Sequence, residues 1–163
     1  MNIEIANKFS DTVAALCKKN SIKTIAYENE TISLKSFHTF KEATHCDFIG
    51  IDDKLMKIRN IKSNEEIEMM IKANDIAEKS FLELLNFVKT GKSEKELQAY
   101  FDYLMAKNGS DGLSFSTILL TGTHTSLPHG VPSDKKIESG DFVLFDFGAT
   151  YKGYHSDMTR TIA

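Results

Sequence analysis

An aspartate interrupts an otherwise apolar segment, Phe142 to Gly148 (FVLFDFG). A near-continuous apolar run of this length is typical of a β-strand that is buried on both faces. The carboxylate of Asp146 would cost several kcal/mol in such a strand if it were charged and unpaired. It therefore has to be neutralised, hydrogen-bonded or bound to a metal ion, and the fold has to supply that partner.

A second aspartate follows on the expected return strand of a hairpin, after Tyr151-Lys152-Gly153. If the turn centres between Tyr151 and Lys152, Asp146 lies directly opposite Asp157, and like charges in that position are destabilising. One or two divalent cations between the carboxylates would remove the conflict. A bulge at Gly153 would shift the pairing by one residue.

Two interpretations of the aspartate pair stay open at this point. The carboxylates bind metal, or they are simply solvated on the hairpin, where Arg160 is also available as a salt-bridge partner that keeps one of them charged.

Composition and charge exclude several classes of protein. Of 163 residues, 41% are hydrophobic and 26% charged, which is typical of a folded globular chain. The net charge is −3 with scattered Lys and Arg, so no nucleic-acid or anionic-membrane surface is indicated. Neither a transmembrane run nor a signal peptide is recognisable. Cys17 and Cys46 are expected to be small core residues in a reduced, cytoplasmic protein.

The first 60 residues alternate between helical and strand patterns. Apolar spacing predicts a helix over about 4–19, and Ile22 to Tyr27 has the period of a short strand. Ser33 is placed to cap a second helix, and Asp47 to Ile51 is predicted to be a second strand. This part is therefore expected to be a small αβαβ layer.

Two Ser-x-x-Glu capping boxes predict two longer helices after residue 60. The boxes are Ser63–Glu66 and Ser93–Glu96. The first helix is expected over about 64–89, with Gly91 as its terminating residue, and Gly109 is expected to end the second helix. Their apolar stripes, including the Phe and Met residues between 69 and 105, are expected to form core.

Beyond residue 110 the apolar runs shorten to strand length. Strands are expected at Ser116–Leu120, Phe142–Ala149 and Tyr154–Ile162, with Pro128 and Pro132 in a loop. The predicted fold class is α/β (α+β), with an αβαβ remnant followed by two antiparallel helices packed on a mostly antiparallel sheet. The expected domains are residues 1–58 and 59–163.

Four motifs, taken together, resemble one known family. Asp146 to Thr161 (DFGATYKGYHSDMTRT) resembles the dimetal signature of the pita-bread peptidases, which include Xaa-Pro aminopeptidases, prolidases and methionine aminopeptidases. Leu127-Pro128-His129-Gly130 resembles the substrate-histidine loop of the Xaa-Pro branch. Residues 61–67 and 137–141 resemble the opening of its catalytic domain and the turn into its first metal strand. Residues 1–55 more loosely resemble the back half of its creatinase-like N-terminal domain.

This resemblance implies an enzyme that hydrolyses the N-terminal Xaa-Pro bond of a peptide with proline in second position. Asp146 and Asp157 would be metal ligands, with Asp157 bridging two ions, and His129 would contact the substrate and stabilise developing charge. The nucleophile would be a hydroxide that the two cations generate from water. Manganese suits hard carboxylate ligands best, with cobalt or zinc as alternatives. No other cofactor-binding residue is implied.

The resemblance also implies that the site is unfinished, because the family adds a later histidine and two later glutamates, and the chain ends at Ala163. The chain is therefore expected to be truncated in both domains and inactive alone. A half-built sheet would leave an edge and an apolar face for homodimers or other association. Neither His124 nor His155 is expected to be a ligand, and Tyr154 is expected to pack.

Two alternatives to an enzyme fragment remain. A non-catalytic pita-bread module could bind peptides or partners, although such proteins commonly lose the aspartates that this chain keeps. A split enzyme completed by a second chain is the other alternative.

Overall fold

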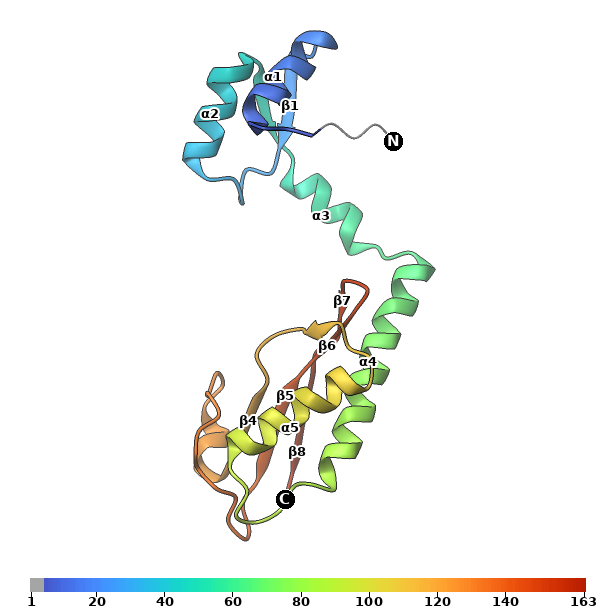
Figure 1. Ribbon diagram of the computed structural model, residues 1–163, viewed down its shortest axis with the longest axis vertical. Coiled ribbons are helices and arrows are strands. Elements are labelled where there is room, and N and C mark those ends of the chain that lie inside the picture. Colours follow the sequence, from blue (N-terminus) through green and yellow to red (C-terminus); the bar gives the residue numbers. More distant parts are fainter. Residues whose placement is uncertain (1–4) are drawn as a thin grey trace. The chain divides into compact units, whose positions relative to one another are not determined.

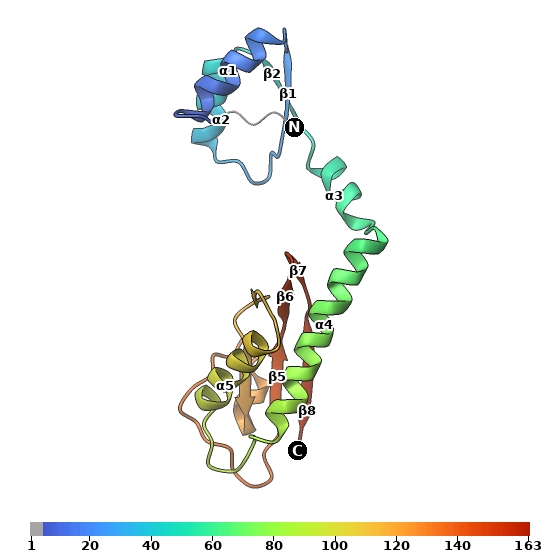
Figure 2. The ribbon, with the colours of Figure 1, turned by 45° about the vertical axis from the view of Figure 1, so that its right-hand side comes forward.

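The computed structural model describes residues 5–163, which form two compact units divided between Ile61 and Lys62 (Figures 1 and 2). In the first unit the elements follow the order α1, β1, α2, β2, α3. Their bounds are Phe9–Lys19, Thr24–Tyr27, Leu34–Thr44, Asp47–Gly50 and Asp52–Asn60. β1 and β2 pair in parallel. The αβαβ order is confirmed, and α3 was not predicted. The expected first helical residue, residue 4, lies outside the described residues.

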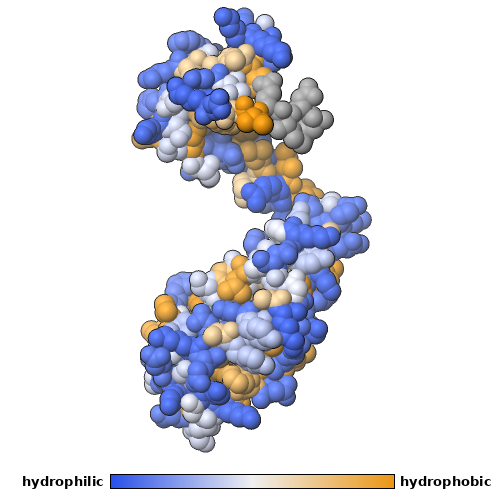
Figure 3. Space-filling view, viewed as in Figure 1, coloured by the Kyte–Doolittle hydropathy of each residue, from blue (hydrophilic) through white to orange (hydrophobic). Residues whose placement is uncertain are grey.

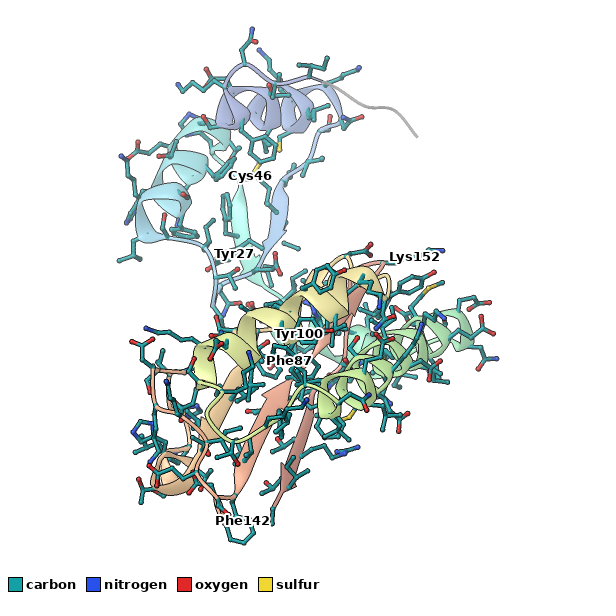
Figure 4. All side chains as sticks on the ribbon, turned by 60° about the horizontal axis from the view of Figure 1, so that its bottom comes forward. Tyr27, Cys46, Phe87, Tyr100, Phe142 and Lys152 are labelled. Atoms are coloured by element: carbon teal, nitrogen blue, oxygen red, sulfur yellow. The ribbon has the colours of Figure 1, made fainter. Side chains whose placement is uncertain are left out.

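Small side chains and aromatic rings form the interior of the first unit. The ring centroids of Tyr27 and Phe37 are 5.2 Å apart, and those of Phe37 and Phe48 are 5.3 Å apart. Cys17 and Cys46 are both buried with free thiols, which confirms the prediction that they are core residues. Figure 4 labels Tyr27 and Cys46 in this unit.

The second unit opens with helices α4, Asn64–Leu85, and α5, Glu94–Lys107, and both predicted capping boxes are present. Gly109 follows α5 at φ 99°, as expected for a helix terminus. α4 ends at Leu85, earlier than the predicted 89. The amides of Phe87 and Val88 both donate to the carbonyl of Leu84, at 2.7 and 3.3 Å, which tightens the chain into a turn.

Two three-stranded antiparallel sheets complete the second unit. One has the order β4-β5-β8, with bounds Ile118–Thr121, Val143–Phe147 and Met158–Ile162. The other has the order β3-β6-β7, with bounds Gly112–Leu113, Ala149–Tyr151 and Tyr154–His155. A 3-10 helix, η1, spans Gly122–Ser126. The mixed α/β class, with helices on a mostly antiparallel sheet, is therefore confirmed.

Strand β5 is buried on one face only, so the expectation of burial on both faces was wrong. Val143, Phe145 and Phe147 are buried, whereas Leu144 and Asp146 are half-buried. The buried residues face the two helices. The ring centroid of Phe81 in α4 lies 5.2 Å from that of Phe145 and 5.5 Å from that of Phe147. Because the helices supply apolar partners to that face alone, the other face remains available for polar side chains.

The core begins part-way along α4. Ala73, Ile76, Ala77, Phe81 and Leu84 are buried. The earlier part of the predicted stripe is exposed, because Ile67, Met70 and Ile71 lie on a different side of α4 from half-buried Met69 and buried Ala73 and Ile76. The ring centroids of Phe87, in the turn after α4, and Tyr100, in the middle of α5, are 4.3 Å apart, and both residues are labelled in Figure 4.

The surface of the second unit is mixed in character. In the view of Figure 3 hydrophilic residues predominate, and apolar residues appear as separate patches. Phe142, labelled in Figure 4, is 60% exposed just before β5. Among the helices described between residues 5 and 163, none combines the length and apolar character needed to cross a bilayer.

Candidate metal and substrate site

The hairpin that carries both aspartates pairs two residues out of the expected register. Asp146 lies opposite Thr159, and Tyr151 lies opposite Tyr154, so the turn centres between Lys152 and Gly153. Both turn residues have positive φ, 49° and 82°, which suits the right-handed twist of a two-residue hairpin. The prediction that Asp146 directly opposes Asp157 was therefore wrong.

Asp111 provides a physical reason for this register. The amide of Lys152 donates a 2.6 Å hydrogen bond to Asp111 Oδ2, which holds a non-glycine residue in the left-handed conformation. Lys152 is labelled at the tip of this hairpin in Figure 4. The partner lies 41 residues away, so the local sequence did not reveal it.

The actual register still places both aspartates on the same face of the hairpin. The amide of Ser156 donates to the carbonyl of Ala149 at 3.0 Å, so the pairing continues between β7 and β8 and sets Asp157 opposite Gly148. Asp146 and Asp157 are then diagonal neighbours, for which about 7–8 Å is typical. Diagonal placement keeps both carboxylates on one face and relieves the direct charge repulsion of an opposed pair.

Both carboxylates have oxygens available for ligands. Thr159 Oγ1 donates to Asp146 Oδ1 at 3.0 Å, the one side-chain hydrogen bond of Asp146 among the described residues. Asp157 is exposed. Hard carboxylate oxygens suit divalent cations. Within residues 5–163 no group of three or more metal-ligating side chains assembles, so these two aspartates fit part of a coordination shell.

Arg160 does not neutralise either aspartate. It lies opposite Phe145, so strand alternation places it on the other face from Asp146. Its guanidinium donates to the carbonyl of Thr159 at 2.8 Å. The alternative in which Arg160 forms a salt bridge to the pair therefore has no support among the described contacts.

The loop with His129 lies over the face that carries Asp146. In the β4–β5 pairing, Leu120 is opposite Leu144 and Ile118 is opposite Asp146, so Leu120 shares that face. Gly130 seats the loop there, because an added Cβ would lie 2.6 Å from Leu120 Cδ1. His129 itself is exposed. The loop that carries His129 and the two aspartates, from three segments, thus lie at one face of the sheet.

A buried carboxylate, Glu94, was missed by the sequence interpretation. It is 0% exposed in the first turn of α5, where a glutamate is ordinary because it favours the helix dipole. Its oxygens accept hydrogen bonds from the amides of Thr121 and Ser133, both at 2.8 Å, and from the Ser133 hydroxyl at 2.6 Å. No local pattern indicated these partners.

His124 completes this cluster. Its Nδ1 lies 3.1 Å from Glu94 Oε1. Burial raises the pKa of Glu94, but the hydrogen bonds from Ser133, Thr121 and His124 together outweigh burial and hold the pKa below the usual glutamate range. Glu94 is therefore a charged group whose lone pairs are used by the protein itself.

Two other residues considered from the sequence have structural partners. His155 Nδ1 lies 3.0 Å from Thr150 Oγ1 in the β6–β7 hairpin. The hydroxyl of Tyr154 donates to Glu66 Oε1 at 2.9 Å, and this bond raises the pKa of the tyrosine. Tyr154, which was expected to pack, thus also joins the hairpin to α4 through a hydrogen bond.

Comparison with known proteins defines the class. Residues 68–163 match metallopeptidase family M24. The Xaa-Pro dipeptidase of Pyrococcus furiosus is 44% identical over 133 residues, which cover 81% of this chain and 38% of that relative. The chain belongs to metallopeptidase family M24.

Solved structures agree with this assignment. An X-Pro aminopeptidase from Thermotoga maritima has a TM-score of 0.92 at 40% identity, covering 98% of this chain and 46% of that one. An Xaa-Pro dipeptidase from Bacillus anthracis has a TM-score of 0.94 at 40% identity, covering 99% and 45%. The resemblance to pita-bread prolidases is confirmed. The chain spans less than half the length of these relatives.

Proposed function

We propose that this chain contributes part of a two-metal active site that hydrolyses the N-terminal Xaa-Pro bond of peptides. The observation that carries the proposal is the common sheet face of Asp146, Asp157 and the His129 loop. Membership of a metallopeptidase family whose relatives are named Xaa-Pro dipeptidase and X-Pro aminopeptidase supports it. Residues 1–58 would be the end of an N-terminal domain and 59–163 half of the catalytic domain.

Each residue has a distinct role in this proposal. Asp146 and Asp157 would hold two divalent ions, most suitably manganese, with Asp157 shared between them. Such ions supply a water of lowered pKa and charge stabilisation when bound. His129 would donate a hydrogen bond to the substrate carbonyl as negative charge develops on its oxygen. Thr159 orients the carboxylate of Asp146 through its 3.0 Å hydrogen bond.

The setting of this activity is also part of the proposal. The free, buried thiols of Cys17 and Cys46 support a reducing compartment, the cytoplasm. Strands β4 and β8 are the outer strands of their sheet as described, and pairing along them would allow homodimers. A mass by light scattering that stays monomeric at high concentration would contradict the dimer.

Titration calorimetry of Mn²⁺ into the chain tests the proposed site. We expect weak binding, because two carboxylates supply only part of a coordination shell, and we expect Asp146→Ala and Asp157→Ala each to remove it. Asp134→Ala is the matched control, since Asp134 is an exposed aspartate engaged with Lys95. Binding that survives both site substitutions would refute the metal assignment.

Hydrolysis of an Xaa-Pro dipeptide by the same preparation tests the reaction. We expect no rate above background for this chain alone, because the two carboxylates supply only part of the coordination shell that two metal ions need. Rapid, Mn²⁺-dependent cleavage that Asp146→Ala abolishes would confirm the activity and overturn the expectation that the chain alone is inactive.

A further inference from the structure

One carboxylate holds both ends of the loop that carries His129. The loop leaves β4 at Thr121, passes through η1 and the Leu127–Gly130 segment, and returns at Ser133. Glu94 Oε1 accepts from the amide of Thr121, at the start of the loop, and Oε2 accepts from the amide and hydroxyl of Ser133, at its end. A single side chain thus brings together two points twelve positions apart in sequence.

The middle of the loop is tied to the same carboxylate. His124 in η1 places Nδ1 3.1 Å from Oε1 and 3.3 Å from Oε2 of Glu94. Since an ionised carboxylate only accepts hydrogen bonds, Nδ1 of His124 has to carry the proton. Glu94 therefore contacts the loop at its beginning, its helical turn and its end.

The backbone of α5 reinforces this anchor. The amide of Glu94 donates to the carbonyl of Lys135 at 3.0 Å, and the amide of Lys95 donates to the carbonyl of Ser133 at 3.1 Å. These bonds fasten the loop exit to the first turn of a helix whose Leu97, Phe101 and Leu104 are fully or almost fully buried. The exit of the loop is thereby held by a helix that packs in the core.

We propose that Glu94 is a positioning residue that holds the His129 loop in one conformation over the face of Asp146. Glu94 touches neither proposed ligand and acts only through Thr121, His124 and Ser133. The role of Glu94 in catalysis rests on the proposed function, but its effect on the conformation of the loop does not. The seating of Gly130 against Leu120 is the contact through which that effect reaches the site face.

Nuclear magnetic resonance of the chain tests this role with Glu94→Gln, which keeps the size of the side chain and removes its charge. We expect amide exchange at Thr121 and Ser133 to accelerate at least about tenfold, as their charged acceptor is lost. Cross-relaxation between Gly130 and the Leu120 methyls should weaken, and the imidazole resonances of His129 should shift or broaden. The amides of α5 beyond Leu97 should keep their protection.

Glu96→Gln is the matched control, because Glu96 lies in the same helical turn but accepts from the amide of Ser93 at 2.8 Å instead. We expect it to accelerate exchange at Ser93 and to leave the Gly130–Leu120 contact and His129 unchanged. The proposal would be overturned if the amide exchange rates of Thr121 and Ser133 in Glu94→Gln stayed within twofold of those in the parent chain. It would also be overturned if both variants changed these rates and the Gly130–Leu120 contact equally.

Ser133→Ala covers the case in which Glu94→Gln does not fold. It removes one donor to Glu94 Oε2 and keeps the carboxylate. Faster exchange of the backbone amide at position 133 and weaker Gly130–Leu120 contact would support the proposal, whereas an unchanged loop would refute it. These measurements need neither metal nor substrate, so failed manganese binding or hydrolysis would refute the proposed function while leaving this test intact.

Discussion

Glu94 and Asp146 are carboxylates of the same unit with contrasting surroundings. Glu94 is fully buried and accepts hydrogen bonds from Thr121, Ser133 and His124. Asp146 is half-buried, and Thr159 is its one side-chain donor among the described residues. The two carboxylates therefore differ both in burial and in the number of internal donors, and the question is which difference separates a structural carboxylate from one that is free to bind a ligand.

The number of hydrogen-bond donors that the protein supplies separates the two kinds of carboxylate. When the protein supplies enough donors to satisfy a carboxylate, the charge stabilises the fold and has no capacity left for a ligand. When it supplies only one, the remaining lone pairs are open to a cation. The contrast predicts that removing Glu94 affects stability strongly and that removing Asp146 affects it little.

The largest effect is expected for Glu94→Ala. It leaves the amides of Thr121 and Ser133 without an acceptor in a buried position, so we expect a loss of about 3–5 kcal/mol of unfolding free energy. Urea unfolding followed by circular dichroism measures this. A loss below about 1 kcal/mol would mean that water replaces the carboxylate, and Glu94 would then differ little from Asp146 in its contribution to stability.

Gly130→Ala is expected to have the next largest effect. Its Cβ would lie 2.6 Å from Leu120 Cδ1, so the loop or the leucine has to move, at a cost of about 1–3 kcal/mol. The same urea unfolding experiment measures the cost. Gly140→Ala is a control for backbone strain, since Gly140 has φ 91° and open space around its Cβ position.

A smaller effect is expected from acid. The pKa of Glu94 is lowered by its hydrogen bonds, so its contribution is fully present above the unfolded glutamate pKa of about 4.3. It is lost as pH falls through the folded pKa. Unfolding free energy between pH 5 and pH 3 should therefore decline less in Glu94→Gln than in the parent chain. Parallel declines would show that other carboxylates dominate.

The smallest effect is expected for Asp146→Asn without metal. The asparagine oxygen can still accept from Thr159, so we expect a change within about 0.5 kcal/mol. Urea unfolding of metal-free protein measures it. A loss above about 2 kcal/mol would make Asp146 a structural residue like Glu94 and would erase the distinction between them.

Features fixed by short-range contacts were predicted well. Each capping box joins residues three apart, Ser63 with Glu66 and Ser93 with Glu96, so a local pattern contains all the partners. The hairpin with Asp146 and Asp157 was predicted for the same reason, because its strands are adjacent in sequence. The end of α4 and the presence of α3 were not, since competing turn bonds and packing decide such boundaries.

By itself the sequence determined the αβαβ order of the first 50 residues, the two capped helices, the burial of Cys17 and Cys46, and the family resemblance carried by the motifs around His129, Asp146 and Asp157. The tertiary structure alone decided the hairpin register, through the bond from Lys152 to Asp111, and the anchoring of the loop by Glu94. Those bonds join residues 27 to 41 positions apart. Contacts at such separation leave no periodic pattern in the chain, because only folding brings their donors and acceptors together.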